Sequence, residues 1–255
     1  VGDPSRVAKV SRHFDQIELT RQHREFVTHT GYCNGQRLTV LSTGIGTPNI
    51  DIVFNELDAL FNIDFTTRKI KSTLQSIKII RIGTTGSLQP DYQVGETVVS
   101  RFAVALDNLL HFYQMQSSPA EQQLQKELAM QLPTLNQAVA PIAIGGDTEL
   151  VEHFLTLCKP GITLTCPGFF GPQARQLRAP LAINGLLEQF QHARLTQGSI
   201  VNYEMETSAI YGLGRILNHR CCSTNLILAN RANSEFMSDI ESALDDFIID
   251  VLGHL

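Results

Sequence analysis

Short β-rich segments alternate with segments of helical periodicity along the whole chain, and this alternation limits the fold more than any other feature. The pattern predicts an α/β protein with a mixed sheet, because strands and helices take turns rather than forming separate blocks. No internal repeat, low-complexity tract or long linker interrupts the pattern, so we expect one domain spanning residues 1–255. We expect strands at residues 37–46, 76–83, 94–106, 141–146 and 222–231, and helices at residues 48–61, 119–131 and 204–219 and from Phe236 to Leu252.

The composition is that of an ordinary globular protein, with 43% hydrophobic and 18% charged residues. The net charge of −5 argues against a nucleic-acid surface, because no basic cluster would offset repulsion from phosphates. No apolar run approaches the roughly 20 residues that span a bilayer. We therefore expect neither nucleic acid nor a membrane as a partner.

The five cysteines are odd in number, and no two are spaced C-x-x-C. This pattern argues against a disulfide framework and against a zinc site. It favours buried free thiols in a reducing compartment, so we expect no metal and a cytoplasmic location.

One permanent cation stands in the apolar segment IIRIGTTGSLQP, residues 79–90. Arg81 lies near the end of the expected strand, two residues before an expected glycine-bracketed turn. Without an anion, its guanidinium would be an uncompensated charge in a core strand. Glycines let backbone N–H groups approach an oxyanion, and arginine adds a fork of donors that matches phosphate. The segment therefore predicts an anion-binding site.

Other segments in the N-terminal quarter carry further glycine turns and arginines. Gly2 and Arg6 lie in GDPSR, Gly44 and Gly46 lie in STGIGTPN, and Arg24 lies in QHREF. Each glycine turn alone is typical of a tight connection, and the spacing matches neither a dinucleotide fingerprint nor a Walker loop. Together the segments favour phosphate as the ligand.

Taken in order, the segments GDPSRV, HREF, STGIGTPN, RIGTTGSLQP and NYEMETSA resemble the motifs of the nucleoside phosphorylase superfamily, in its uridine phosphorylase branch. The resemblance runs from the first residue to about Arg231. It implies a single-domain, three-layer α/β/α sandwich with a central mixed, barrel-like sheet, and homodimers that assemble into a hexamer, a trimer of dimers. It also implies a ribose-contacting histidine upstream of Val1, so we expect that an N-terminal segment has been trimmed.

The resemblance implies a phosphate site formed by Arg6, Arg81 and Thr84, with backbone help from Gly2. Arg24 would reach the phosphate of the neighbouring subunit, so each site would be shared across a dimer.

The segment NYEMETS would supply the ribose site. The resemblance implies that Glu206 accepts hydrogen bonds from the ribose hydroxyls, that Met205 packs on the sugar, and that Thr84 lies beside it. Arg81 and Glu206 are implied to be catalytic, since Arg81 would contact both phosphate and ribose. Read alone, Glu204 and Glu206 would only complement the dipole of a helix start.

The segment PGFFGPQARQLR bears most directly on the substrate. Gln173 and Arg175 are two residues apart, so their side chains point to the same side if the segment is extended. A glutamine amide offers both a donor and an acceptor, and arginine adds donors, a set that complements the edge of uracil. Without the resemblance, the segment would equally suit a surface loop.

The resemblance implies that this pair binds a pyrimidine, that Phe169 stacks on the base, and that Arg231 supports the pair. Thr85 and Gly86 would complete the base site. Purine-cleaving relatives carry an aspartate after the last sheet strand, whereas this chain has Asn230 and Arg231 there. That difference favours a pyrimidine.

These inferences predict a pentosyltransferase that cleaves uridine reversibly with phosphate, giving uracil and ribose 1-phosphate for pyrimidine salvage. Bound phosphate would stabilise an oxocarbenium-like transition state. The sequence does not distinguish uridine from deoxyuridine or thymidine. Two alternatives stay open: a purine nucleoside phosphorylase or nucleosidase of the same superfamily, and a non-catalytic nucleoside-binding protein. The resemblance implies no cofactor beyond phosphate, apart from a structural monovalent cation such as K⁺ near Glu25 at a dimer interface, where Asn49 replaces the family serine.

Overall fold

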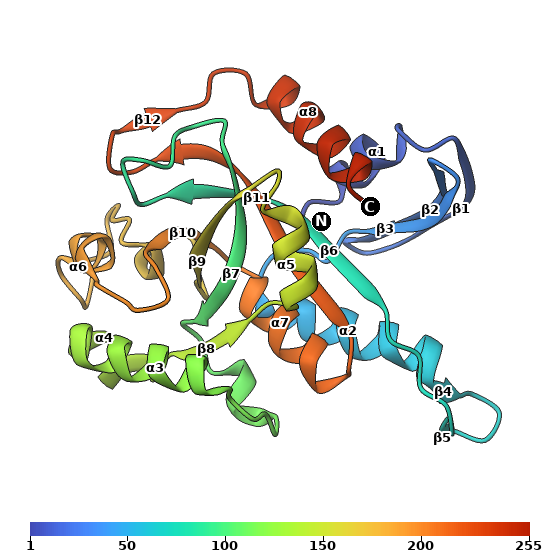
Figure 1. Cartoon of the computed structure of the whole chain (residues 1–255), viewed down its shortest axis with the longest axis horizontal. Coiled ribbons are helices and arrows are strands. Elements are labelled where there is room, and N and C mark those ends of the chain that lie inside the picture. Colours follow the sequence, from blue (N-terminus) through green and yellow to red (C-terminus); the bar gives the residue numbers. More distant parts are fainter.

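The computed structural model describes residues 1–255, and its centre is a mixed sheet in the strand order β12-β11-β6-β10-β9-β7-β8 (Figure 1). β11 also pairs with β7, so the strands from β11 through β6, β10 and β9 to β7 close into a barrel. The predicted mixed, barrel-like sheet is therefore confirmed. The strands are β6 (Lys78–Ser87), β7 (Thr97–Ala105), β8 (Ile142–Gly145), β9 (Lys159–Thr165), β10 (Ile200–Glu204), β11 (Arg220–Asn230) and β12 (Glu235–Phe236).

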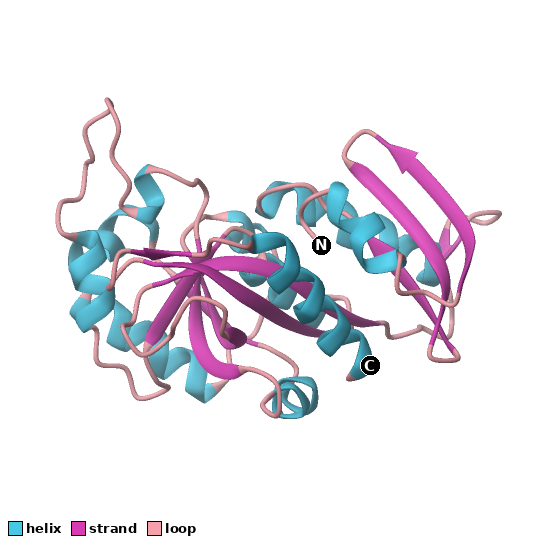
Figure 2. Ribbon diagram, turned by 90° about the horizontal axis from the view of Figure 1, so that it is seen from above, coloured by secondary structure: helices cyan, strands magenta, loops and turns pink.

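Helices pack on the outside of the barrel in three groups, each with its own hydrophobic core (Figure 2). The first group contains α1 (Ser5–Ser11), α5 (Thr148–Phe154) and α8 (Ile240–Gly253). The second contains α3 (Pro119–Gln131), α4 (Pro133–Val139) and α6 (Leu186–His192). The third contains α2 (Thr47–Asn62), α7 (Thr207–Ile216) and the short 3₁₀ helix η1 (Leu109–Phe112).

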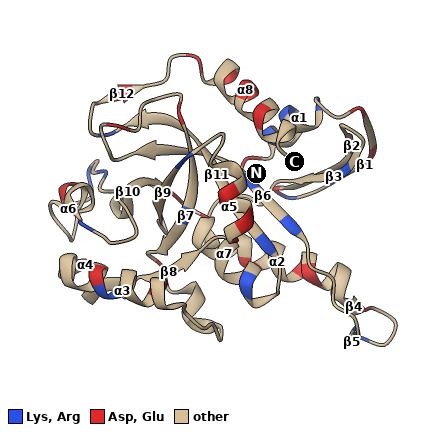
Figure 3. Cartoon of the chain, in the orientation of Figure 1, with Lys and Arg blue, Asp and Glu red and all other residues tan.

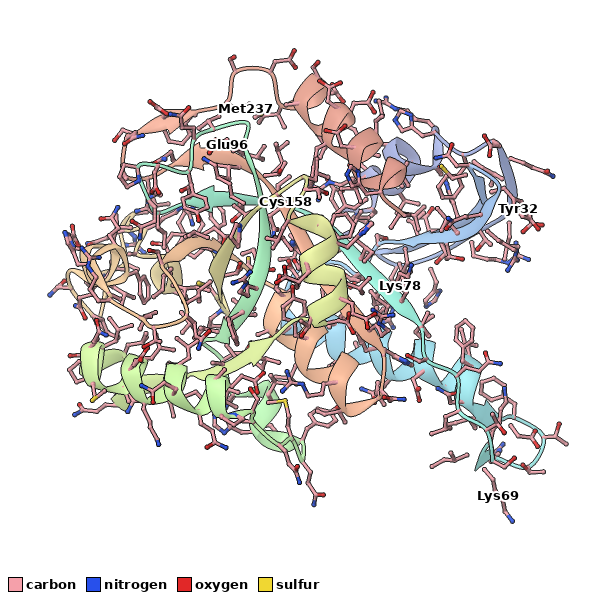
Figure 4. All side chains as sticks on the ribbon, in the orientation of Figure 1. Tyr32, Lys69, Lys78, Glu96, Cys158 and Met237 are labelled. Atoms are coloured by element: carbon pink, nitrogen blue, oxygen red, sulfur yellow. The ribbon has the colours of Figure 1, made fainter.

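Two smaller sheets lie outside the barrel. The strands β1 (Gln16–His23), β2 (Phe26–Cys33) and β3 (Gln36–Leu41) form an antiparallel sheet beside α1. The strands β4 (Ile63–Asp64) and β5 (Lys69–Ile70) form a hairpin that extends from the end of α2, with Lys69 at its far end (Figure 4). None of the helices combines the length and the apolar character that a bilayer crossing requires.

Burial and charge follow the expected pattern. All five cysteines are free and buried, as predicted. Acidic residues recur along α8, while lysines, arginines and acids are interspersed elsewhere (Figure 3).

The observed helix ends agree with those predicted from the sequence where the capping residues are clear. α3 occupies the predicted residues 119–131, because Ser118 and Glu121 form a capping box at its start. The prediction that the last helix begins at Phe236 is wrong, since α8 begins at Ile240 after Asp239, whose side chain accepts a hydrogen bond from Ser242 N. Phe236 lies in β12 and is 79% exposed instead of buried.

The turn predicted after Arg81 is also wrong, because β6 continues through both glycines to Ser87. β11 pairs with β6 in parallel over the whole length of β6, and β10 pairs with its last residues, Gly86 and Ser87. With partners on both sides, the backbone stays extended where the sequence suggested a turn.

Candidate active site

The Arg81 side chain is buried on β6 and bends back over Gly83. Its Nη2 donates to Glu206 Oε2 at 2.6 Å and lies 3.3 Å from Glu204 Oε2, and its Nη1 donates to Asn225 Oδ1. A Cβ atom on Gly83 would overlap the guanidinium, so this arrangement requires glycine. Burial opposes the charge, but the two glutamates outweigh it and raise the pKa of Arg81. The charge is thus compensated within the chain, contrary to the expectation that only an anion would do so.

Glu204 lies at the end of β10 and is completely enclosed. Its Oε2 accepts hydrogen bonds from the backbone N–H groups of Glu206 at 2.7 Å and Thr207 at 2.8 Å, and its Oε1 accepts one from Thr165 Oγ1 at 2.6 Å. It therefore caps α7 and fixes the backbone that carries Glu206. Burial raises the pKa of Glu204, against the opposing charge of Arg81.

The glycine loop before α2 contacts the same cluster. Gly46 N donates to Glu206 Oε1 at 2.7 Å, so Glu206 connects this loop with Arg81. Gly44 and Gly46 have φ angles of 76° and 92°, which other residues adopt only with strain. Gly2 packs on the carbonyl of Gly44, so the first and second predicted motifs lie together.

Arg6 provides a second guanidinium beside Arg81. It lies on α1, and its Nη1 donates to the Ile82 carbonyl at 3.3 Å. Its Nε is buried and has no hydrogen-bond partner. Burial and then the like charge of Arg81 lower the pKa of Arg6. An anion bound between the two arginines would satisfy the free donor and relieve the repulsion.

The residues after Arg81 on β6 differ in their environments. Thr84 is half-buried, and its hydroxyl makes no hydrogen bond within the chain. The Thr85 hydroxyl donates to the Tyr203 carbonyl and accepts from Asn202 Nδ2 at 2.9 Å, so it is engaged inside the barrel.

Gln173 and Arg175 lie in a tight turn rather than an extended segment. Gln173 ends the 3₁₀ helix η2 (Gly171–Gln173), and Ala174 has a positive φ of 53°. The two side chains nevertheless meet as predicted, because Arg175 Nη1 donates to Gln173 Oε1. Gly86 lies beside them, since a Cβ on it would be 3.8 Å from Arg175 Nη2.

Phe169 and Arg231 complete this second cluster. The Arg175 guanidinium lies 4.0 Å from the centre of the Phe169 ring, and this ring is 53% exposed. Arg231 donates to the Gln173 carbonyl at 3.0 Å and to the Ala174 carbonyl at 3.2 Å. Arg231 thus stabilises the turn through its backbone carbonyls. Burial and then the positive charge of Arg231 lower the pKa of Arg175.

Three predicted residues are not joined to these clusters by hydrogen bonds. Met205 is half-buried between β10 and α7, next to Glu206 in the chain. Arg24 lies exposed in the turn between β1 and β2 with a φ of 53°. Glu25 follows it and lies near Gly44, and no group of three or more acids, histidines or cysteines is placed to hold a metal.

The sequence reasoning missed Asn225. It lies opposite Gly83 on β11, in a strand of mostly apolar residues. Ser223 and Asn225 are two residues apart and so face the same side of the sheet, toward Arg81 and Thr207. The polar run Ser223–Thr224–Asn225, inside the otherwise apolar stretch from Cys221 to Ala229, was the available signal.

A cavity of about 320 Å³ lies elsewhere, at the opposite end of α7. It is lined by Asp147, Arg215, Arg220 and their neighbours and contains none of the predicted site residues. Its arginines are already paired with Glu121, Asp147 and Glu149. The candidate site is therefore the arginine–glutamate cluster with the neighbouring Gln173 turn.

Comparison with known proteins points to one family. Residues 1–249 match the family model of the phosphorylase superfamily. The chain is 30% identical over 235 residues to a uridine phosphorylase of Thermococcus kodakarensis, covering 92% of this chain and 73% of that protein. It is 27% identical over 242 residues to a uridine phosphorylase of Haemophilus influenzae, covering 93% and 82% of the two chains.

A solved structure is similar over nearly the whole molecule. It is a nucleoside phosphorylase of Trypanosoma brucei that is described as showing uridine phosphorylase activity. The two structures superpose with a TM-score of 0.89 at 26% sequence identity, covering 99% of this chain and 90% of that one. A purine nucleoside phosphorylase of Thermoanaerobacter is 33% identical, but only over 100 residues, or 39% of this chain.

Proposed function

The chain belongs to the phosphorylase superfamily, and on this basis we propose that it is a pentosyltransferase that cleaves uridine with phosphate to give uracil and ribose 1-phosphate. One observation carries the proposal. The Arg81 guanidinium is buried, and the half-buried Arg6 lies beside it with a free donor at its buried Nε, while Glu206 contacts Arg81. These groups would hold an anion next to the Glu206 carboxylate, which would bind the hydroxyls of the sugar.

Phosphate would bind between Arg6 and Arg81. The unpartnered Nε of Arg6 would donate to one phosphate oxygen, and the free hydroxyl of Thr84 would be available to another. Gly2 would help through its backbone. Glu204 and Glu206 both pair with Arg81, whereas Arg6 forms no ion pair within the chain, so its charge is available to phosphate.

Ribose would lie against Glu206 and Met205. Glu206 already accepts from Gly46 and Arg81, and as a carboxylate it has lone pairs left for the ribose hydroxyls. Because Arg81 would contact both phosphate and ribose, it would align the nucleophile with C1′.

Uracil would bind at the Gln173 turn, next to Phe169. Gln173 Oε1 accepts from Arg175 and keeps one lone pair for the uracil N3–H, while its amide nitrogen can donate to a ring carbonyl. Thr85 and Gly86 would line this part of the site from β6. Arg231 would keep the turn in place through its two bonds to backbone carbonyls.

In the reaction, a phosphate oxygen would form a bond to C1′ as the bond from C1′ to N1 breaks. The electron pair would pass to the uracil ring, where Arg175 and Gln173 stabilise the charge that develops. The phosphate charge would stabilise the oxocarbenium-like sugar between them. No strong general acid is needed, since uracil can leave as a delocalised anion.

We also propose that the active unit is a homodimer with shared sites, within a hexamer. Arg24 lies at the exposed tip between β1 and β2, where its side chain is free to serve a partner subunit. The five buried free thiols favour the cytoplasm as the place of the reaction.

A structural K⁺ ion near Glu25 has weaker support. Asn49, which stands where the family has a serine, uses its amide N–H to bond the Ile45 carbonyl at 3.1 Å rather than presenting a hydroxyl oxygen to a cation. We therefore expect activity without added K⁺.

The experiment that tests the proposed function incubates the protein with uridine, with and without phosphate, and follows the release of uracil. Release that requires phosphate, with none from inosine, would support a pyrimidine phosphorylase. Equal release without phosphate would mean hydrolysis. The absence of release with intact phosphate binding would favour a non-catalytic nucleoside-binding protein. Deoxyuridine and thymidine, tested under the same conditions, would define the sugar and base preference.

A further inference from the structure

The Arg81 guanidinium belongs to a closed, buried ring of polar contacts. Its Nη1 donates to Asn225 Oδ1, Asn225 Nδ2 donates to Ser223 Oγ at 3.3 Å, and the Ser223 and Thr207 hydroxyls are 2.8 Å apart. Thr207 N donates to Glu204 Oε2, which returns to Arg81 Nη2 at 3.3 Å. The ring joins β6, β11, α7 and β10 behind the guanidinium.

Strand register explains how this ring forms. Asn225 pairs with Gly83 across the parallel strands β11 and β6, and Arg81 pairs with Ser223. Because Gly83 has no side chain, the Arg81 guanidinium can fold over it and meet Asn225 directly. Asn225 is fully buried, so no water competes for its amide oxygen.

Arginine has only donors, so the amide must present its oxygen to Arg81 and its nitrogen to Ser223. We propose that Asn225 is a positioning residue, whose amide oxygen holds the Arg81 guanidinium in the orientation that binds phosphate. This inference rests on the proposed function, because it assigns phosphate to Arg81.

The neutrality of Asn225 matters as well as its shape. Arg81 already has two carboxylates beside it, those of Glu204 and Glu206. An aspartate at position 225 would keep the acceptor oxygen but add a third carboxylate, which would repel phosphate. An amide is the side chain of this shape that orients Arg81 without adding charge.

Two substitutions separate orientation from charge. Asn225→Ala removes the acceptor, so we expect kcat to fall at least about tenfold and the Kd for phosphate to rise, as for a misplaced catalytic group. Asn225→Asp keeps the acceptor, so we expect kcat at saturating phosphate to stay within about threefold while the Kd for phosphate rises roughly tenfold. If the alanine variant does not fold, Asn225→Ser keeps a small polar side chain in the same layer and should behave like it.

Asn202→Ala is the matched control. Asn202 is also a fully buried asparagine in the sheet, with bonds to Thr85 and Thr163 and none to Arg81. Removing the Asn202 side chain measures the general cost of losing a buried amide. We expect the Asn202→Ala protein to melt at a lower temperature than the wild type, with its Kd for phosphate unchanged within about twofold.

The readouts are the Kd for inorganic phosphate by calorimetry, without nucleoside, and kcat with uridine. A second test introduces Asn225→Ala into Arg81→Ala, where we expect no further loss beyond about twofold because Asn225 acts through Arg81. Wild-type phosphate affinity in both the alanine and serine variants, or an additive loss in the double variant, would overturn the inference. Wild-type protein that binds phosphate but does not cleave uridine would contradict the proposed function alone, since the effect of Asn225 on phosphate affinity could still be measured.

Discussion

At the scale of single residues, the site depends on what surrounds one arginine. Arg81 is buried, but two glutamates compensate its charge, an amide oxygen accepts one of its hydrogen bonds, and the missing side chain at Gly83 gives it room. The sequence singled out Arg81 and the glycines as parts of a site, and the structure brings Arg81, Gly83 and Gly46 into one cluster. It did not indicate their relation, because a glycine in a strand and a glycine in a turn look alike without knowledge of strand pairing.

Replacement of Arg81 by alanine tests the phosphate assignment. We expect Arg81→Ala to fold and to lose at least about a hundredfold in phosphate-dependent turnover, as for the loss of a strong transition-state contact. Steady-state rates with varied phosphate measure this loss. Arg101→Ala, at an exposed arginine paired with Glu152, is the control and should keep its rate. A near-normal rate for Arg81→Ala would remove the basis of the phosphate site.

Gly83→Ala tests whether the folded-back orientation matters. The added Cβ would overlap the Arg81 guanidinium and Asn225 Oδ1, both of which are ends of side chains rather than backbone and can move away. We therefore expect a folded protein with a loss of about a hundredfold in kcat, comparable to other misplaced catalytic groups. Gly253→Ala, where a Cβ meets nothing within 4 Å, is the control. Equal activity in the two variants would show that the position of the guanidinium is unimportant.

At the scale of elements, the sequence was most informative where local chemistry decides the structure. α3 could be placed to the residue because a serine, a proline and a glutamate mark its first turn. The contact between Gln173 and Arg175 was expected for a partly wrong reason: they meet through a turn with a positive φ at Ala174, which the residue type does not reveal. The start of α8 was misjudged at Phe236 because an apolar residue before a helix fits the helical period by chance.

Glu121 at the start of α3 provides a test of stability and its pH dependence. It binds Arg215 through two hydrogen bonds of 2.6 and 2.9 Å and also accepts from Gly145 N. Burial alone would raise the pKa of Glu121, but these bonds outweigh it and lower the pKa below the ordinary value of 4.5. We expect Glu121→Gln to lower the free energy of unfolding by about 2 kcal/mol at pH 7.

The sign of the pH dependence follows from that lowered pKa. The charged form contributes its full stabilisation above pH 4.5, and this is lost as the pH falls through the lower pKa of the folded state. Urea unfolding of wild type and Glu121→Gln should therefore differ by a constant amount from pH 8 to about 5.5 and converge in more acidic solution. Glu56→Gln, at an exposed glutamate on α2, is the control. A difference that grows with acid would contradict this account.

At the scale of the whole molecule, the barrel brings together segments that are far apart in the chain. Residues near positions 6, 46, 81, 206 and 225 meet at one place because β6, β10 and β11 are neighbours, although β10 and β11 follow β6 by more than a hundred residues. Ordered motifs therefore predicted the family, whereas the contacts between the candidate site residues depended on sheet order, which no short segment specifies.

Mixing two inactive variants tests the proposal that subunits share their sites. In a dimer of Arg24→Ala and Arg81→Ala chains, one site would combine an intact Arg81 with an intact Arg24 of the partner, and the other would lack both. Random exchange should restore about a quarter of the wild-type sites, because half of the dimers are mixed and each has one intact site. Turnover assays before and after subunit exchange measure the recovery. No recovery, with exchange verified, would place Arg24 outside the shared site.

The central claim is that phosphate is the nucleophile that replaces the base on the sugar. Phosphorus NMR of the protein with uridine and inorganic phosphate tests it most directly, because both phosphorus species are seen in one spectrum. We expect the phosphate signal to fall and a ribose 1-phosphate signal to rise in step with uracil release. Uracil and free ribose appearing while the phosphate signal stays constant would contradict the account.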